Sequence, residues 1–193
     1  MNQKQSQFLE FKVLKTQARV SNFTRHPKRV KCVETLAHTL SPTRFSSLDW
    51  IDQLDDKGII AGGMEDGAIT LWSASKILDA DSQQNQLGRG CISAAQIHQG
   101  TPVHTLEFNP HKKNLLASGG SEVLIQDISQ LKRPTKFKPG EPNFHEGHRI
   151  TSISWNRVVS HILASASEDG KIVVWDLKQS KSIFQFTEPR QNQ

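Results

Sequence analysis

Cysteine is scarce in this chain of 193 residues, and long apolar runs are missing. Cys32 and Cys91 are far apart and form no CxxC pair, which predicts free thiols in a reducing compartment rather than a disulfide framework. No apolar run approaches the roughly 20 residues that a transmembrane helix needs. Residues 1–15 also lack the apolar segment of a secretory signal. We therefore expect a cytoplasmic protein.

The motifs of enzymes and metal sites are missing as well. There is no glycine-rich phosphate loop and no dinucleotide fingerprint. The segment from His145 to His148 lacks the spacing of a zinc-binding HExxH helix, and no cysteine pair accompanies it. A His–Asp–Ser set exists in the last third of the chain, but without the nucleophile turn of a hydrolase. We expect no catalysis, no metal ion and no cofactor.

Acidic residues are scarce only at the start of the chain. Residues 1–46 carry nine Lys or Arg against Glu10 and Glu34, whereas the remaining residues carry 15 basic and 17 acidic groups. Such a segment could meet phosphates or an acidic membrane surface, or it could be a solvated loop between strands. It has no array of aromatic residues for stacking bases, which favours the solvated loop. We expect no nucleic acid partner.

What the sequence does contain is a repeat. Three segments align: IIAGGMEDGAITLWSA at 59–74, LLASGGSEVLIQDI at 115–128 and ILASASEDGKIVVWDL at 162–177. Each begins with an apolar strand rich in small residues and ends with a β-branched strand. Asp66-Gly67 and Asp169-Gly170 lie between two such strands, which is a strong hairpin signal. The middle segment fits if two residues are missing from its turn.

The length of the repeat predicts the fold. Trp72, Gln126 and Trp175 take the same place, with separations of 54 and 49 residues. Further strands are expected upstream, at 47–51, 103–108 and 151–155, and downstream, at 91–97, 135–138 and 182–186. Four short strands in about 50 residues are typical of a propeller blade. A single helical turn is expected at 74–80.

The predicted fold is therefore all-β, an incomplete WD-repeat β-propeller of about three and a half blades of antiparallel four-stranded sheet. The expected divisions are a partial first blade with a basic loop (1–45), three blades (46–97, 98–144 and 145–187) and a tail (188–193). The partial blade has strands near 8–14 and 32–36. An open arc of blades leaves the faces of its terminal sheets bare, so we expect the chain to self-associate or to pack loosely.

The last repeat matches the WD signature, with Gly147-His148 upstream, Asp169-Gly170 in the turn and Trp175-Asp176 at the end of the strand. The resemblance to WD blades implies a hydrogen-bonded set of His148, Asp169, Trp175 and either Ser165 or Ser167. Asp66, Gly67 and Trp72 mark the corresponding turn and strand of the first full blade, where Ser73 replaces the aspartate. In the second, Gln126 replaces the tryptophan, so its set is incomplete and its stability should be the lowest.

Residues 151–177, TSISWNRVVSHILASASEDGKIVVWDL, are more specific than a generic WD repeat. With FSSLDW at 45–50, HQGTPVHTLEFNPHKKNLLASG at 98–119 and LEFKVL at 9–14, they resemble the large outer-cage subunit of the COPII vesicle coat, the Sec-thirty-one (SEC31) family. The characteristic features are Trp155, Asn156 and Arg157, followed by HILASAS. The resemblance is strongest over 45–186 and concerns the WD-repeat propeller of that family, of which this chain looks like a fragment.

This resemblance implies a non-enzymatic protein-interaction scaffold in transport from the endoplasmic reticulum to the Golgi. The implied partners are a small propeller partner, the inner coat and further copies at the cage vertices, with the membrane reached only through the coat. The implied location is cytoplasmic, peripheral at endoplasmic reticulum exit sites and COPII vesicles. The alternative is a WD-repeat adaptor subunit of an unrelated complex. In either case partners dock on the loops, and the long loops at 73–90 and 131–146 are either contact or insertion sites or simple linkers.

Overall fold

The computed structural model of the protein describes residues 43–52, 54–78, 90–131, 133–145 and 147–187 with their side chains, and 7–13 and 34–41 by their backbone. These residues form fourteen strands and one short helix. β1 (Gln7–Val13) and β2 (Glu34–Ser41) pair with each other in antiparallel fashion. The other strands form three four-stranded antiparallel sheets, each with its strands in chain order.

Each of these sheets is one blade. The first blade contains β3 (Phe45–Ile51), β4 (Ile59–Met64), β5 (Ala68–Ser73) and β6 (Cys91–Gln96). The second contains β7 (Thr105–Phe108), β8 (Leu115–Gly119), β9 (Val123–Asp127) and β10 (Thr135–Phe137). The third contains β11 (Ile150–Trp155), β12 (Ile162–Ser167), β13 (Lys171–Asp176) and β14 (Lys181–Thr187). The short helix α1 (Ala74–Leu78) follows β5.

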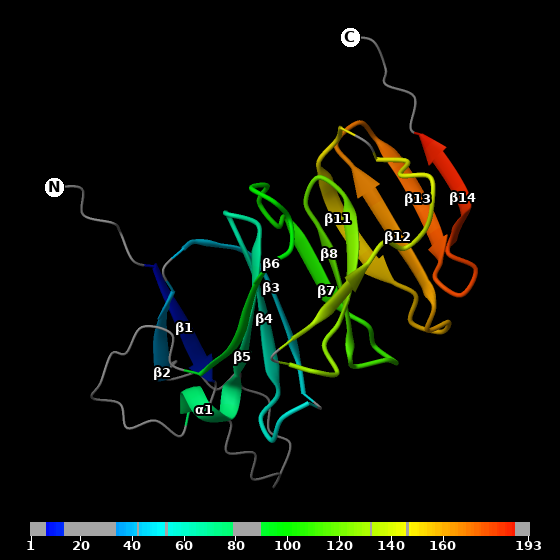
Figure 1. The fold of residues 1–193 in the computed structure, drawn as a ribbon. Helices are drawn as coiled ribbons and strands as arrows, with labels where there is room; N and C mark the ends of the chain where they lie inside the picture. The colour runs from blue at the N-terminus through cyan, green and yellow to red at the C-terminus, as the bar shows by residue number, and fades with distance from the viewer. Residues whose placement is uncertain are drawn as a thin grey trace, which may run out of the picture.

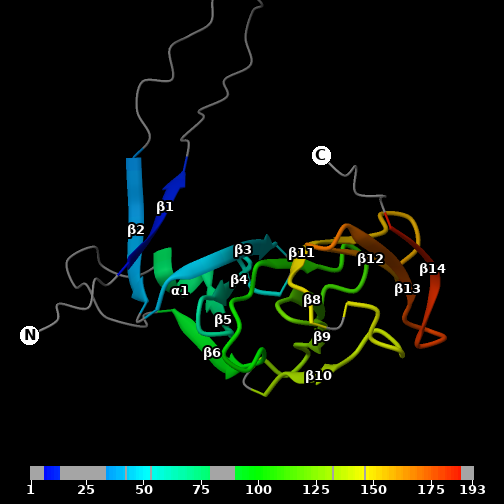
Figure 2. The same cartoon turned by 90° about the horizontal axis from the view of Figure 1, so that it is seen from above.

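The blades stand side by side along an open arc, with the β1–β2 pair beyond the first blade and β14 at the opposite end (Figures 1 and 2). The prediction of an all-β, incomplete WD-type propeller is thus confirmed. The hairpin turns also form as expected. Gly67 has a φ of 88°, and a Cβ atom there would lie 1.6 Å from the carbonyl oxygen of His98, so only glycine fits this turn.

Most of the apolar core lies between neighbouring blades, and a smaller cluster around Trp72 lies between the first blade and α1. One cluster joins the first and second blades, including Leu71 and Leu116, and another joins the second and third, including Ile125 and Leu163. The small residues of the repeat allow this contact. A Cβ atom on Gly119 would lie 2.5 Å from the side chain of Ile150 in the next blade.

Most strand limits differ from the predicted ones by one or two residues, and the following differences are informative. The second strand of the partial blade was expected near 32–36, but β2 occupies 34–41, and residues 32 and 33 lie outside the described residues. β7 begins at Thr105 and not at Val103, because the amide of Val103 donates to the carbonyl of Met64 in the first blade, 3.1 Å away. β10 is only three residues long.

Candidate functional site

In the third blade a continuous set of hydrogen bonds links the strands. The indole Nε1 of Trp175 donates to Ser165 Oγ at 2.8 Å. The ring of His145 lies 2.7 Å from Ser165 Oγ through Nε2 and 2.8 Å from Ser167 Oγ through Nδ1. Ser167 in turn donates to the carboxylate of Asp169. Because Asp169 can only accept, the protons have one consistent order: His145 carries its proton on Nδ1 and accepts from Ser165.

The histidine of this set is His145, and the prediction of His148 is wrong. The side chain of His148 is 45% exposed, and its Nε2 reaches only to 3.7 Å from Asp169 Oδ2. The physical reason is a turn, in which the amide of His148 donates to the carbonyl of His145 at 3.0 Å. This turn leaves His148 outside, while His145 is fully buried against Trp175. Ser165, Asp169 and Trp175 are brought together as expected.

A signal for His145 was present in the second repeat. There the ring of His98 lies 2.8 Å from Ser118 Oγ, and the two residues are 20 positions apart, the same separation as His145 and Ser165. The amide Nε2 of Gln126 also donates to Ser118 at 2.8 Å, in the manner of the Trp175 indole. A comparison of histidine-to-serine spacings would therefore have selected His145 over His148.

The set of the second blade is incomplete, as predicted. Gly120 occupies the position of Ser167, so no hydroxyl is available to the second ring nitrogen of His98. Within the described residues, His98 Nδ1 and Gln126 Oε1 are buried without a hydrogen-bond partner. Buried polar atoms without partners are costly, which makes this blade the weakest of the three in hydrogen bonding.

In the first blade the tryptophan indole bonds to a threonine hydroxyl instead of a serine hydroxyl. Trp72 Nε1 donates to Thr70 Oγ1 at 2.8 Å, because Gly62 stands where the third blade has Ser165. Asp66 lies in the turn with Gly67, where its exposed carboxylate accepts from the amide of Ala68 at 3.0 Å. It marks the hairpin but takes no part in a buried set.

Burial and hydrogen bonding shift the protonation of these sets. Burial lowers the pKa of His98 from 6.5 to about 4, and it also lowers the pKa of His145. Hydrogen bonds, first of all from the Ser167 hydroxyl, hold the pKa of Asp169 well below its usual range. Both histidines are therefore neutral and Asp169 is charged at neutral pH, as the proton order in the third blade requires.

The residue that follows Trp72, Gln126 or Trp175 is a hydrogen-bond acceptor in two blades and a donor in the first. Asp176 accepts from the amide of Lys178 at 2.8 Å, and Asp127 accepts from the side chain of Asn114 at 3.0 Å. In the first blade Ser73 takes this position and its hydroxyl donates to Asp55, which lies on the β3–β4 loop. In the first blade the carboxylate (Asp55) therefore lies on the β3–β4 loop and the donor (Ser73) lies after the tryptophan. In the second blade the donor (Asn114) precedes β8 and the carboxylate (Asp127) ends β9.

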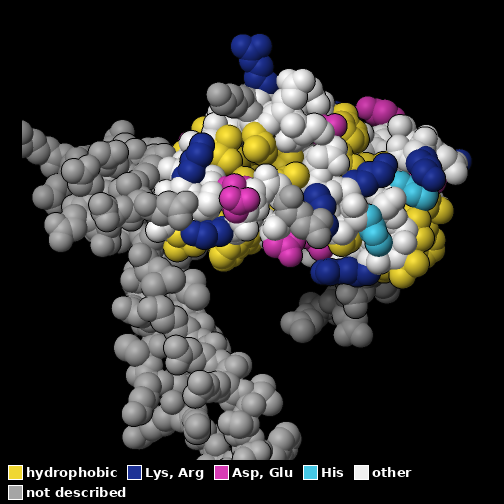
Figure 3. Space-filling model, turned by 90° about the horizontal axis from the view of Figure 1, so that it is seen from below, with side chains coloured by type: hydrophobic (Ala, Val, Ile, Leu, Met, Phe, Trp, Pro, Cys, Tyr) yellow, Lys and Arg dark blue, Asp and Glu magenta, His cyan; other side chains and the backbone are white. Residues whose placement is uncertain are grey.

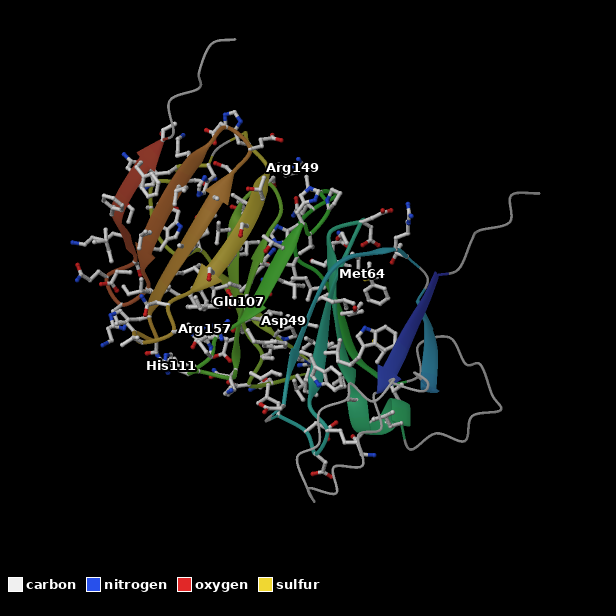
Figure 4. All side chains as sticks on the ribbon, turned by 180° about the vertical axis from the view of Figure 1, so that it is seen from behind. Asp49, Met64, Glu107, His111, Arg149 and Arg157 are labelled. Carbon is white, nitrogen blue, oxygen red and sulfur yellow. The ribbon has the colours of Figure 1, made fainter. Side chains whose placement is uncertain are left out.

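The blades are also joined directly by two carboxylates on the innermost strands. Asp49 Oδ2 accepts from the amide of Phe108 at 2.6 Å. At the equivalent place in the next blade, Glu107 Oε2 accepts from the amide of Trp155 at 2.8 Å, and the Glu107 carbonyl accepts from the Trp155 indole at 2.9 Å. Arg157 lies 3.6 Å from Glu107 (Figure 4). These contacts account for Trp155 and Arg157 of the WNR motif, which the sequence flagged without a physical reason.

Asn156, the middle residue of that motif, shapes the loop. Its Oδ1 accepts from the amides of Val158 and Val159, both at 2.8 Å. Asn109 does the same in the second blade, where its Oδ1 accepts from His111 and Lys112. Its Nδ2 also donates to the carbonyl of Ser160 in the third blade at 2.8 Å. The motif is thus a junction between two blades.

The end of the arc that carries these loops has two open grooves. The inner groove, of about 470 Å³, lies among Asp49, Asp52, Glu107, Lys113 and Arg157. The outer groove, of about 510 Å³, lies between the first and second blades and is lined by residues that include Leu54, Asp55, Lys76, Ile92 and Leu131. Figure 3 looks at this end and shows charges of both signs among apolar side chains. The sequence did not predict the inner groove, because its members come from three blades.

The described residues offer neither a metal cluster nor a membrane-spanning helix. No cluster of three or more His, Cys, Asp or Glu side chains in this part of the chain could hold a metal ion. None of the helices described is long and apolar enough to cross a membrane.

The chain is similar to known proteins over most of its length. Residues 141–176 match the family described as WD domain, G-beta repeat. The chain is 41% identical to protein transport protein SEC31 of Dictyostelium discoideum over 76% of its own length and 11% of that protein. It is 40% identical to SEC31 of Ajellomyces capsulatus over 71% of the chain and 10% of that protein.

A solved structure agrees with these relatives. The chain superimposes with a TM-score of 0.64, at 27% identity, on a chain from "COPII on membranes, outer coat vertex". The superposition covers 81% of this chain and 40% of that one. The chain thus spans about a tenth of the length of the curated relatives it matches and less than half of the solved one.

Proposed function

Because the chain belongs to the SEC31 family of protein transport proteins in its WD-repeat region, we propose that it is a non-enzymatic scaffold of the COPII outer coat. The observation that carries the proposal is the agreement of sequence and structure on one family. The same region is about 40% identical to SEC31 proteins and superimposes on a chain of the outer coat vertex.

The networks of the blades suit a scaffold. The His–Asp–Ser residues of the third blade bond to one another and to Trp175, so their donors and acceptors are engaged inside the sheet. Their role is to hold strands together and to fix the loops at the two ends. The residue divisions 46–97, 98–144 and 145–187 are proposed as the units of this scaffold, with 1–45 as a partial blade and 188–193 as a tail.

We assign docking to the loop end that carries the two grooves. Loops of a propeller present side chains from several blades to one partner, whereas the strands bury theirs. The inner groove offers both acidic and basic side chains, which favours a polar protein surface over a hydrophobic ligand. The proposed partners are the small propeller partner, the inner coat and further copies at cage vertices, with no nucleic acid and with the membrane reached only through the coat.

The proposed location is cytoplasmic, at endoplasmic reticulum exit sites and on COPII vesicles. The test is the distribution of a fluorescently tagged chain beside a marker of the inner coat. The expected result is puncta that coincide with the marker. A diffuse or nuclear distribution would contradict the proposal, and a nuclear one would favour a WD-repeat adaptor of another complex.

A pair of charge reversals tests the assigned end. Lys113→Glu places a negative charge in the inner groove beside Asp52, whereas Arg149→Glu changes an exposed side chain that pairs with Glu168 and lies outside both grooves. We expect Lys113→Glu to reduce the puncta and Arg149→Glu to leave them unchanged. Equal loss in both variants would argue against docking through the grooves.

A further inference from the structure

Two loops at the end that carries the grooves share one backbone design. In each loop the side-chain oxygen of an asparagine accepts from the amides two and three positions further along the chain, at 2.8 to 2.9 Å. The asparagines are Asn109 in the second blade and Asn156 in the third. Residues 109–112 and 156–159 are called the twin turns below. Because the asparagines fix the same two amides in each loop, the twin turns present the side chains at these positions in the same way.

The twin turns are also bonded to each other. Asn109 Nδ2 donates to the carbonyl of Ser160, directly after the turn of the third blade, at 2.8 Å. The ring Nε2 of His111 lies 3.0 Å from the carbonyl of Arg157, which can only accept, so the ring donates there. Figure 4 shows His111 and Arg157 side by side at this end of the molecule. The two turns therefore form one fixed surface across the junction of the second and third blades.

The same frame carries different side chains in the two turns. The second blade presents His111 and Lys112, both exposed. The third presents Val158 and Val159, which are 85% and 36% exposed. Turn positions favour small polar residues, which bond to the nearby backbone, and an exposed valine side chain makes no such bond. Val158 is thus an apolar contact surface that the turn itself does not require.

Positive charge borders the valines. The side chain of Arg157, next to Val158 in the chain, is 79% exposed. Lys112 is exposed on the neighbouring turn. The carboxylate that pairs with Arg157, at 3.6 Å, belongs to Glu107, whose side chain is only 20% exposed. The twin turns therefore combine an aliphatic centre with accessible cationic groups beside it.

We propose that the twin turns bind a protein segment in which an aliphatic side chain lies between acidic ones. The aliphatic side chain covers Val158, and the carboxylates pair with Lys112 and Arg157. Because hydrogen bonds already hold both turns in place, little conformational entropy is lost on association. The inference rests on the proposed docking function of this end of the arc and names the chemistry of the segment that docks.

An acidic membrane surface shares the negative charge of such a segment but fits this end less well. The β3–β4 loop lies at the same end and carries Asp52 and Asp56, both exposed. A broad anionic bilayer repels these carboxylates, whereas a narrow protein segment on the neighbouring blades avoids them. The charges of the whole end therefore favour a protein partner.

Peptide binding followed by fluorescence anisotropy tests this chemistry. The probe is a fluorescein-labelled hexapeptide with two central leucines and two glutamates on each side. Two control peptides replace the leucines by serine or the glutamates by lysine. We expect the purified chain to bind the probe about tenfold or more tightly than either control peptide, because each control loses one of the two kinds of contact.

Substitutions locate the contact. Val158→Ser removes the exposed methyl groups and Lys112→Glu reverses a charge beside them, and each should weaken binding of the probe about tenfold. The matched controls are Phe137→Ser and Arg149→Glu, at exposed positions outside the twin turns, and they should bind like the unmodified chain. Lys112→Glu should also strengthen binding of the lysine peptide, a gain that unfolding does not produce.

The outcomes separate this inference from the coat proposal. Equal binding of the three peptides, or equal losses in the control variants, overturns the inference. Binding to vesicles that contain phosphatidylserine, lost in Val158→Ser and without binding of the probe, also overturns it and assigns the surface to a membrane. Puncta in cells without probe binding reject only the inference, whereas probe binding without puncta supports it and rejects the coat function.

Discussion

Glu107 and Trp155 are joined at two points, through the carboxylate to the backbone amide and through the carbonyl to the indole. The two residues are 48 positions apart and belong to different blades. Burial raises the pKa of Glu107, and Arg157 offsets part of that effect. One side chain and one backbone group of Glu107 thus bond the second blade directly to the third.

Glu107→Ala should destabilise this junction. It leaves the amide of Trp155 without its acceptor, which costs about 1–3 kcal/mol of unfolding free energy. Glu107→Gln keeps an acceptor oxygen at the same place and should cost less. Denaturant unfolding followed by tryptophan fluorescence compares the two. If Gln and Ala were equally harmful, the charge and not the hydrogen bond would be the important property.

His145 should matter far more than His148. His145→Ala leaves Ser165 and Ser167 without the ring that joins them and opens a buried gap, so we expect a loss of about 2–4 kcal/mol. His148→Ala removes a half-exposed ring and should change the unfolding free energy by less than about 0.5 kcal/mol. Thermal and denaturant unfolding of both variants decide the point. The reverse order would restore His148 to the set.

The two turn aspartates provide a second matched pair. Asp169→Ala removes the acceptor of the Ser167 hydroxyl and of the Lys171 amide, and the expected loss is about 1–3 kcal/mol. Asp66→Ala removes one exposed hydrogen bond to Ala68 and should cost less than about 1 kcal/mol. Melting temperatures of the two variants measure the difference. Equal losses would show that the buried set does not stabilise the third blade.

Acid should weaken the fold through its buried histidines. The pKa of His98 is lowered to about 4 in the folded protein and is about 6.5 in the unfolded chain, so the unfolded state binds more protons between these values. The stabilisation is fully present above pH 6.5 and is lost as the pH falls towards 4. The lowered pKa of His145 adds a change of the same sign.

Unfolding free energies measured across this pH range provide the check. Glu107, whose pKa is raised, changes stability in the opposite direction, so a variant must isolate the histidine. His98→Gln should flatten the pH dependence by about 1–3 kcal/mol over the range. A slope that is unchanged in His98→Gln would assign the effect to other groups.

The second blade should open before the third. His98 Nδ1 and Gln126 Oε1 are buried without partners, and β10 is only three residues long. Hydrogen exchange followed by mass spectrometry should show earlier exchange in β9 than in β13, because local opening requires less free energy where fewer interactions are lost. Equal protection of the two strands would show that the missing partners have little effect.

The fold could be predicted from the sequence because its signals are local. The Asp-Gly turns and the step from a strand of small residues to a β-branched strand each act within a few positions, and the recurrence of this unit is read directly along the chain. Strand limits were less accurate where a contact between blades decided them. The amide of Val103 bonds to Met64 in the first blade, and nothing in the sequence around Val103 indicates this.

The site could be predicted only in part for the same reason. The resemblance to WD blades implied Asp169, Trp175 and either Ser165 or Ser167, but which of His145 and His148 joins them depends on which one the turn directs inward. The inner groove depends on Asp49, Glu107 and Arg157, which three blades bring together. Such a combination requires the curvature of the arc, and no single repeat contains it.

The reversed pair of Asp55 and Ser73 constrains how these blades can be exchanged. Aspartate at position 73 would face Asp55 across the loop, so two negative charges would meet where one donor and one acceptor now lie. Serine at position 55 would leave the hydroxyls of Ser73 and Ser75 without their shared carboxylate. Restoring the Trp-Asp dipeptide of the repeat in this blade therefore takes two simultaneous changes, and a consensus design that corrects Ser73 alone would lower the stability it aims to raise.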